Sequence, residues 1–361
     1  MTAVPERMRA VLLTGNGGFD FLALRGDVPV PQPKPGEVLI RVGAAGVNNT
    51  DINTRTAWYS KSVDSPTKAG GAAGFAGAQT EDSGWTGALP QFPRIQGADA
   101  CGYIVAVGVG IDPARIGERV LVEPVFRAPD AGLGDAVYFG SERDGAFAEY
   151  TTAPSAHAHR ITSNLSDAEL ASFPCAYSAA ENMLTRVALT RGERVLITGA
   201  SGGVGSAAVQ LAVRRGADVI AVVGSDKATA VRALGAGKCI PRGTDLVEAL
   251  GGESVDVVID IVGGTQFVQL FALLRRGGCY AVAGAIAGPV VALDLRTLYL
   301  KDLRLIGCTV LEQGVFANLI GYIERGEIKP LVAATYPLNE IVAAQTAFLA
   351  KAHVGKIVLL P

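Results

Sequence analysis

Four glycines between residues 198 and 205 form the segment best suited to chemistry, Thr-Gly-Ala-Ser-Gly-Gly-Val-Gly. An apolar stretch typical of a buried strand precedes them, and apolar residues at helical spacing follow. Glycines let the backbone turn sharply and approach a pyrophosphate, which unpaired N–H groups at the start of a helix can bind. This context predicts a dinucleotide-binding turn that contacts its ligand through Ser201, Gly202, Gly203 and Val204. The spacing departs by one residue from G-x-G-x-x-G, so a tight turn without a ligand remains the alternative.

The end of the second predicted strand indicates which dinucleotide is bound. An acidic residue at this place would hydrogen-bond a free ribose hydroxyl. Here Gly224 and Ser225 leave room for a 2′-phosphate, and Lys227 and Arg242 can supply positive charge to it. Asp226 lies near the acidic position and argues for NADH instead. We expect NADPH as the cofactor, with ordinary solvated surface as the alternative role of the two basic residues.

Strands and helices alternate from about residue 161 to residue 310, which predicts a parallel sheet with right-handed crossovers. Ligands bind at the carboxyl ends of such strands. We therefore expect Val262 and Gly284, which follow two later strands, to approach the cofactor, and Lys356 near the C-terminus to return to the same place. Glycines at strand ends have an equally good structural explanation.

The first third of the chain has a different pattern. Alternating or apolar segments at 8–13, 36–43 and 95–109 predict strands of a small irregular barrel, and 355–360 predicts a terminal strand. Residues 59–92 are rich in small residues without periodicity and indicate a long inserted loop. These patterns predict a barrel domain at 1–160 and 311–361, with a dinucleotide-binding domain at 161–310.

Composition excludes several classes of protein. The chain has 361 residues, 49% of them hydrophobic and 18% charged, so disorder is excluded as its main state. A net charge of −2 argues against a nucleic-acid partner. No apolar run is long enough to predict a membrane span, and no secretory signal is visible. Five scattered cysteines without a C-x-x-C pair indicate reduced thiols, so we expect a cytoplasmic protein.

Beside the glycine segment, five other motifs occur along nearly the whole chain. They are Pro35-Gly-Glu-Val-Leu-Ile-Arg-Val, Ala45-Gly-Val-Asn-Asn-Thr-Asp51, Pro93-Arg-Ile-Gln-Gly-Ala-Asp-Ala-Cys-Gly102, Asp144-Gly-Ala-Phe-Ala-Glu-Tyr150 and Gly355-Lys-Ile-Val-Leu. In this order they resemble the medium-chain dehydrogenase/reductase superfamily, and within it the zinc-free quinone oxidoreductase branch that includes zeta-crystallin. The resemblance implies an α/β fold, with a GroES-like β-barrel catalytic domain beside a Rossmann doubly wound parallel sheet. It also implies a cleft between the two domains and a homodimer, for which the apolar segment 303–308 is the expected contact edge.

The departures from zinc-dependent members of the superfamily bear on the chemistry. Those enzymes carry cysteine where this chain has Asn48 and histidine where it has Ala98, and only Cys175 falls near a third ligand position. One thiolate cannot make a catalytic zinc site with three protein ligands. The four-cysteine lobe that holds a structural zinc is also missing from 122–150. We therefore expect no metal.

The resemblance aligns Asn48, Asp51, Arg55 and Tyr59 with residues that line the nicotinamide and substrate cleft. We expect Tyr59 to donate a hydrogen bond or a proton to the substrate, and Asn48 to orient the nicotinamide or the substrate oxygen. A packing tyrosine and a loop cap are the alternatives for these two. Asn53 stands where a tyrosine is often found.

Without a metal, a quinone or a conjugated carbonyl is an easier acceptor than a plain ketone, because negative charge spreads over the conjugated system. We expect an NADPH-dependent, zinc-independent reductase of quinones or α,β-unsaturated carbonyls. The alternatives are an alcohol or aldehyde dehydrogenase of this fold without zinc, and a nucleotide-binding protein like zeta-crystallin with little turnover. The loop at 59–92 is interpreted as a lid that sets substrate size, or else as a surface or dimer-contact loop.

Overall fold

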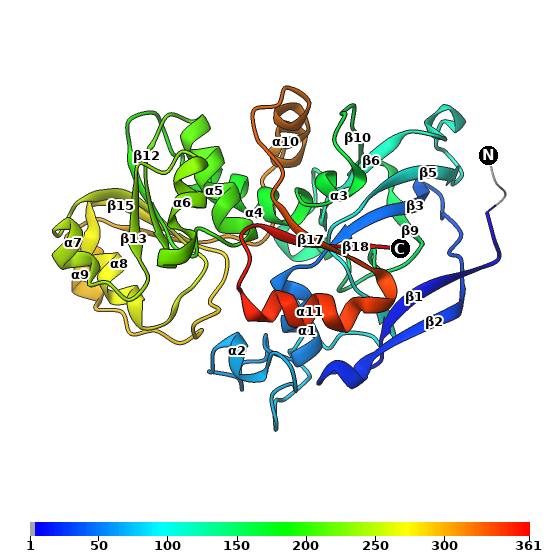
Figure 1. Ribbon diagram of the computed structural model, residues 1–361, viewed down its shortest axis with the longest axis horizontal. Coiled ribbons are helices and arrows are strands. Elements are labelled where there is room, and N and C mark those ends of the chain that lie inside the picture. The colour runs from blue at the N-terminus through cyan, green and yellow to red at the C-terminus, as the bar shows by residue number, and fades with distance from the viewer. Residues whose placement is uncertain (1–3) are drawn as a thin grey trace.

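The computed structural model describes residues 4–361. Figure 1 shows two lobes: a parallel sheet with its helices (green to orange) and a β-rich lobe (blue to cyan), against which the C-terminal helix α11 (Ile341–Ala350) packs. The last strand returns to the β-rich lobe, so the chain visits that lobe twice.

The β-rich lobe is built on β3, most of whose residues are buried. β3 pairs with β5 and β9 along its length and with β18 at its carboxyl end, in a sheet of order β10-β6-β5-β3-β18-β17. β2, β1 and β4 form a second sheet, and β7 and β8 a short hairpin. The strands of this lobe are β1 (Arg7–Leu13), β2 (Leu22–Pro29), β3 (Glu37–Gly46), β4 (Arg94–Ile95), β5 (Cys101–Val107), β6 (Arg119–Val122), β7 (Val125–Phe126), β8 (Val137–Tyr138), β9 (Tyr150–Pro154), β10 (Ala158–Arg160), β17 (Val332–Pro337) and β18 (Lys356–Leu360).

The second lobe is a six-stranded parallel sheet of order β13-β12-β11-β14-β15-β16. The chain starts at β11, builds outward to β13 and returns to β14 on the other side, so the strand order reverses between β11 and β14. Ligands of such sheets bind at the carboxyl ends of the strands, next to this reversal. The strands are β11 (Arg194–Ile197), β12 (Asp218–Val223), β13 (Lys238–Pro241), β14 (Val255–Asp260), β15 (Leu274–Val282) and β16 (Arg304–Gly307).

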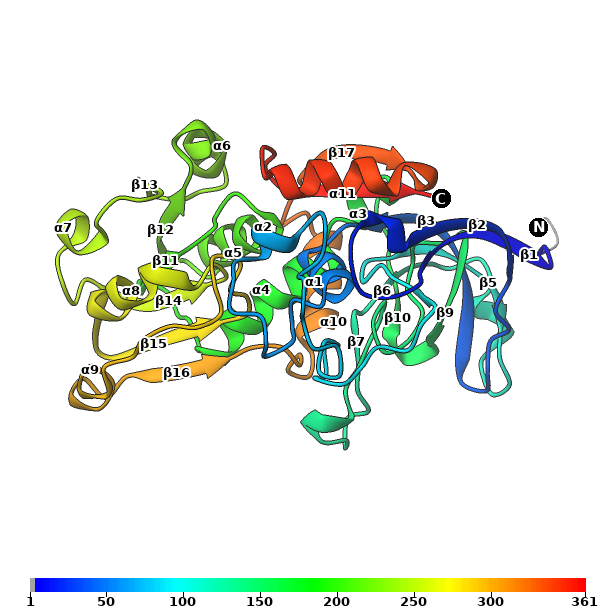
Figure 2. The same cartoon turned by 90° about the horizontal axis from the view of Figure 1, so that it is seen from below.

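Helices cover both faces of this sheet, as Figure 2 shows for α4 and α5 on one side and α8 on the other. The helices are α1 (Asn49–Thr56), α2 (Thr67–Gly70), α3 (Asp167–Leu170), α4 (Pro174–Arg186), α5 (Gly203–Arg214), α6 (Ala228–Ala233), α7 (Leu246–Leu250), α8 (Phe267–Leu273), α9 (Leu295–Leu300), α10 (Val315–Glu324) and α11.

Two elements differ from the sequence prediction. The expected strand at 95–109 is broken: β4 ends at Ile95, β5 begins at Cys101, and the loop between them carries Asp99. The helix predicted from Ser166 is two helices. Ser166 caps α3 through a hydrogen bond from the Glu169 N–H (3.3 Å), but α3 ends after one turn and a new helix starts at Pro174. Proline has no N–H to donate and is accommodated at a first helical position, so the second helix begins there.

Candidate active site

The glycine segment forms a sharp turn between β11 and α5. Gly199 has φ +57°, in the left-handed region that favours glycine. A Cβ atom at Gly205 would lie 2.2 Å from the Gly199 carbonyl oxygen, so α5 approaches the turn more closely than any side chain allows. Gly202 is extended (φ −78°, ψ 176°) and starts the twelve-residue helix α5. The turn therefore presents the free N–H groups of a helix end beside bare backbone, which fits the pyrophosphate of a dinucleotide.

A buried aspartate supports this turn from the neighbouring strand. Asp260, at the end of β14, accepts hydrogen bonds from the Thr198 hydroxyl (2.5 Å), the Val262 N–H (2.9 Å) and the Tyr280 hydroxyl. Burial raises the pKa of Tyr280, so this phenol stays a donor. The carboxyl ends of β11, β14 and β15 are thereby fixed to one another next to the strand-order reversal.

The other residues expected at the cofactor lie around the same edge. Val262 is in contact with the turn, because a Cβ atom at Gly199 would lie 3.1 Å from its Cγ2. The Arg242 N–H donates to the Val223 carbonyl (2.9 Å), so its exposed side chain leaves the sheet beside Gly224. Further residues in this region are Ser201, whose carbonyl accepts from the Gly355 N–H (3.0 Å), Ser225, which is exposed after β12, and Gly284, which follows β15.

Lys227 lies where the two lobes meet. It ends the 3-10 helix η5 (Ser225–Lys227), its side chain is buried, and its ammonium donates to the carbonyl of Lys351 at the end of α11. Burial, Lys356 and Lys227 together lower the pKa of Lys351 to about 7. Burial together with Lys351, Lys227 and Lys356 lowers the pKa of His353 to about 4. The C-terminal segment 351–356 thus places Lys351 and His353 near Lys227 and Lys356, whose positive charges disfavour protonation of both side chains.

Asn48, Asp99 and Lys356 form a second buried cluster. The Lys356 ammonium donates to Asp99 Oδ2 (2.8 Å), Asn48 Oδ1 (2.5 Å) and the Val47 carbonyl (3.0 Å). Asn48 Nδ2 donates to Asp99 Oδ2 (2.8 Å), and the Cys175 N–H donates to Asp99 Oδ1 (2.5 Å). An ammonium has three donors, and all three are used inside the protein. Lys356, expected to contact the cofactor, therefore has no donor left for it.

The hydrogen-bond donors of Asn48 are occupied as well. Its second amide hydrogen is directed at the Gly46 carbonyl (3.3 Å), and its oxygen accepts from Lys356. Its donors are therefore engaged within the chain, and its position caps the start of α1. Asp51 in the first turn of that helix accepts from the Asn48 N–H (2.7 Å) and the Gly97 N–H (3.3 Å). Burial raises the pKa of Asp51 to about 7.

Tyr59 follows α1 and is half-buried, with its ring edge-on to Trp58 (5.8 Å between ring centres). Burial raises its pKa to about 12, while hydrogen bonds with Thr50 and Asn53 act in the opposite direction. The Tyr59 hydroxyl is therefore protonated at neutral pH and is available as a donor.

Arg55 is not brought together with the other predicted residues. It is fully buried and donates to the Gly17 carbonyl (2.8 Å), the Gly71 carbonyl (2.7 Å) and Gln345 Oε1 (3.0 Å). Its guanidinium also lies over the ring of Phe19 (4.5 Å). Arg55 lies on α1 together with Asp51, but its side chain fastens the N-terminal segment, the insertion and α11 to each other.

The chain matches two known protein domains. Residues 34–163 match the alcohol dehydrogenase GroES-like domain, and residues 203–325 match the zinc-binding dehydrogenase domain. A crystal structure from Sinorhizobium meliloti 1021, provisionally assigned as an alcohol dehydrogenase, superposes with a TM-score of 0.89 at 48% identity, covering 100% of this chain and 98% of that one. The chain belongs to the medium-chain dehydrogenase/reductase superfamily.

Two curated relatives define the branch of the superfamily. Quinone oxidoreductase from Homo sapiens is 28% identical, with 100% of each sequence covered. NADPH-dependent alkenal/one oxidoreductase, chloroplastic, from Arabidopsis thaliana is 27% identical over 99% of this chain and 81% of the relative. The predicted family and fold are confirmed: the chain is an oxidoreductase of the quinone oxidoreductase branch, with a GroES-like domain, a Rossmann-type sheet and the nicotinamide cofactor that this fold implies.

The insertion of this oxidoreductase is packed against both lobes. The Thr67 N–H at the start of α2 donates to the Ile286 carbonyl of the parallel-sheet lobe (3.1 Å), and its hydroxyl donates to Asn53 Oδ1 on α1 (3.4 Å). Trp85 stacks on Tyr138 of β8, with ring centres 4.2 Å apart. The insertion thus bridges the two lobes beside the helix that leads to Tyr59, and the lid hypothesis stays a prediction.

Two further findings delimit the site. Among residues 4–361, no group of three or more His, Cys, Asp or Glu side chains could hold a metal ion. No helix in the same range is long and apolar enough to cross a membrane.

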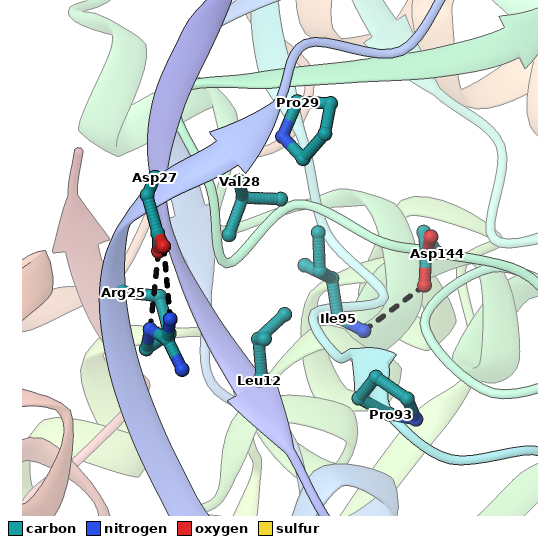
Figure 3. Close-up of a pocket in the computed structure, with 8 residues that line it drawn as sticks. All are labelled: Leu12, Arg25, Asp27, Val28, Pro29, Pro93, Ile95 and Asp144. Atoms are coloured by element: carbon teal, nitrogen blue, oxygen red, sulfur yellow. Dashed lines mark hydrogen bonds and ion pairs between the residues drawn. The ribbon is translucent and has the colours of Figure 1, made fainter.

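A surface hollow of about 350 Å³ lies on the barrel between β1, β2 and β4, where Arg25 pairs with Asp27 (Figure 3). The hollow lies in the β-rich lobe, away from the glycine turn. It is lined mainly by apolar residues, and its charged residues Arg25, Asp27 and Asp144 are in ion pairs.

Sequence reasoning assigned no role to Asp99, Lys351 or Thr67. For Asp99 a signal was present, because a carboxylate inside the apolar run Gly-Ala-Asp-Ala-Cys-Gly must be buried and paired. The partners of Lys351 and Thr67 come from distant segments, and no local pattern indicates them.

Proposed function

We propose that this oxidoreductase uses NADPH to reduce quinones or α,β-unsaturated carbonyls without a metal. The observation that carries the proposal is the Lys356 ammonium, which lies in the cluster of Asn48 and Asp99, beside the Cys175 backbone. Asn48 and Cys175 are two of the positions at which or near which zinc-dependent relatives carry ligands, and Asp99 follows the third, Ala98. A buried ammonium repels a divalent cation, so activation of the acceptor must come from conjugation and hydrogen bonding.

The cationic residues near the end of β12 support NADPH over NADH. Lys227 and Arg242 lie on the Rossmann side, and Lys227 contacts Lys351 of the C-terminal segment. A terminal phosphate on the ribose would find compensating charge there. Asp226 is the observation that favours NADH, because its Oδ1 lies 2.7 Å from the position of a Cβ atom at Gly224.

The residues of the chain then have distinct tasks. Bound NADPH supplies a hydride. The glycine turn binds its pyrophosphate, and Val262 limits the space behind the turn. Tyr59 donates a hydrogen bond, or a proton, to the oxygen of the acceptor. The insertion, which contacts both lobes through Thr67, limits the size of the acceptor.

The test is a set of NADPH and NADH oxidation measurements by stopped flow, with a quinone, an enone and a primary alcohol as partners. We expect turnover with the first two, a preference for NADPH, and activity that survives dialysis against a chelator. Loss of activity with the metal would identify a zinc enzyme, oxidation of the alcohol alone would identify a dehydrogenase, and binding without turnover would identify a cofactor-binding protein.

Lys227→Met tests the assignment of the cofactor. We expect the Kd for NADPH to rise at least tenfold and the Kd for NADH to stay within threefold. Lys238→Met is the matched control, because Lys238 on β13 is exposed and donates to the Ala249 carbonyl (3.3 Å) away from the edge. An equal loss for both coenzymes would contradict a phosphate-specific role.

We also propose a homodimer formed through β16. β16 ends the sheet order, so its outer edge is open, and Leu305 on it is 46% exposed. Tyr299 and Leu300 beside it are 62% and 57% exposed. A second copy of this chain could continue the sheet across that edge. Light scattering should give twice the mass of the chain, and Leu305→Lys should give a monomer; a wild-type monomer would reject the dimer.

The cytoplasmic location of the protein stays a prediction.

A further inference from the structure

Lys356 physically joins the glycine turn to the helix that leads to Tyr59. Its chain neighbour Gly355 forms an isolated parallel bridge with Gly202, and the Gly355 N–H donates to the Ser201 carbonyl (3.0 Å). The alkyl part of Lys356 lies on the turn itself, because a Cβ atom at Gly203 would lie 2.9 Å from Lys356 Cδ. The position of Lys356 is therefore set by the turn.

The other end of the same side chain is fixed to the catalytic lobe. The ammonium holds Asn48 at the start of α1 and Asp99 in the loop between β4 and β5. Asp99 in turn accepts from the Cys175 N–H in the first turn of α4. The side chains of Lys356 and Asp99 are only 4% and 0% exposed. One ion pair thus connects the glycine turn, α1, α4 and the β4–β5 loop.

Direct contact with ligand does not explain this pair. The three donors of the ammonium are occupied, so a phosphate gains nothing from Lys356 except distant charge. Burial of an ion pair is seldom favourable by itself compared with apolar packing, but removal of one partner leaves an uncompensated charge. Such a pair is well suited to fixing a single arrangement of the segments that it joins.

We propose that Lys356 and Asp99, which are both hydrogen-bonded to Asn48, are positioning residues. They keep α1, and through it Tyr59, in a fixed position relative to the cofactor turn. The inference rests on the proposed function for its kinetic readout. Misplacement of a reacting group by about 1 Å can lower a rate about 100-fold. Loss of the pair should therefore lower the rate of the chemical step while leaving the affinity for the cofactor nearly unchanged.

The experiment compares Lys356→Met, Asp99→Asn and the double variant with wild type. Methionine keeps the alkyl packing on Gly203, and the double variant leaves no buried charge unpaired. We expect kcat at saturating NADPH to fall at least tenfold in each variant, the Kd for NADPH to stay within threefold, and the double variant to recover thermal stability without recovering kcat. Lys301→Met is the matched control, since Lys301 is a partly buried lysine that donates to the Ala272 and Leu274 carbonyls and leaves the pair intact.

A second readout does not depend on turnover. Hydrogen–deuterium exchange of residues 49–56 should be faster in Lys356→Met than in wild type or the Lys301→Met control. A tenfold weaker Kd with unchanged kcat would make Lys356 a cofactor contact, and recovery of kcat in the double variant or unchanged exchange would overturn the positioning role. If wild type neither binds NADPH nor reduces an enone, the proposed function fails, and the exchange comparison still decides the role of the pair.

Discussion

Replacement of Gly202 by alanine separates the binding role of the glycine turn from its structural role. The backbone of Gly202 is in a region that alanine adopts freely, and the added Cβ atom would meet only the Gly199 carbonyl oxygen at 3.5 Å, an ordinary contact. Alanine restricts the unfolded chain, which stabilises by about 0.4–1 kcal/mol. It is also a poorer residue before a helix than glycine, by a similar amount. These effects offset each other, so the melting temperature should change little.

Cofactor affinity should respond differently, because the new methyl group stands where a pyrophosphate would approach the N–H groups of α5. Loss of one hydrogen bond to a charged oxygen weakens binding by about 1.5–3 kcal/mol. At about 1.4 kcal/mol for each factor of ten, the Kd for NADPH should rise roughly 10- to 150-fold. The measurements are a fluorescence titration with NADPH and a thermal unfolding curve on the same preparation.

Gly205→Ala is the structural counterpart. Its Cβ atom would lie 2.2 Å from the Gly199 carbonyl oxygen and 2.7 Å from its carbonyl carbon, both backbone atoms that cannot move independently. Such overpacking destabilises by about 1–3 kcal/mol, so this variant should lose stability as well as affinity. If Gly202→Ala binds NADPH with the affinity of wild type, the pyrophosphate does not lie on this turn and the reasoning fails.

Three further predictions concern single side chains. Tyr59→Phe should lower kcat by about 100-fold at saturating NADPH, within the usual contribution of an acid group, with little change in melting temperature; stopped-flow rates equal to wild type would remove the phenol from the mechanism. Arg55→Met removes three buried hydrogen bonds, each worth about 1 kcal/mol, so urea unfolding should show a loss of about 3 kcal/mol while kcat/KM of the folded enzyme stays within threefold. Burial raises the pKa of Asp51 to about 7, so the folded protein holds a proton that the unfolded chain releases near pH 4, and the contribution of this group to stability is present in acid and lost as pH rises through 7. Asp51→Asn should therefore show a flatter fall in unfolding free energy between about pH 4 and pH 7 than wild type, and identical slopes would contradict the raised pKa.

Local patterns were sufficient for the elements around the glycine turn. The apolar strand before it, the turn itself and the helical spacing after it are determined by short-range backbone chemistry, and the structure has β11, the turn and α5 there. The family motifs extended this to both domains, and the comparisons confirm the family and the fold. The position of Asp99 was not predicted, because a strand with bends at Gly97 and Gly102 was expected where the structure has β4, a loop and β5.

Side-chain partners far apart in the chain were decided only by tertiary structure. Arg55 aligns with substrate-facing residues, yet its partner Gln345 is 290 residues away and turns the guanidinium into the protein. Lys356 was expected at the cofactor because the C-terminal segment returns to the cleft, but its ammonium pairs with Asp99, 257 residues away. By itself the sequence determined that a glycine turn joins a strand to a helix, because this depends on local backbone geometry. It also determined the family, because that depends on short motifs along the chain. Packing between distant segments determines which charged groups are paired inside the protein and which are available to a ligand. Only the folded molecule decides this.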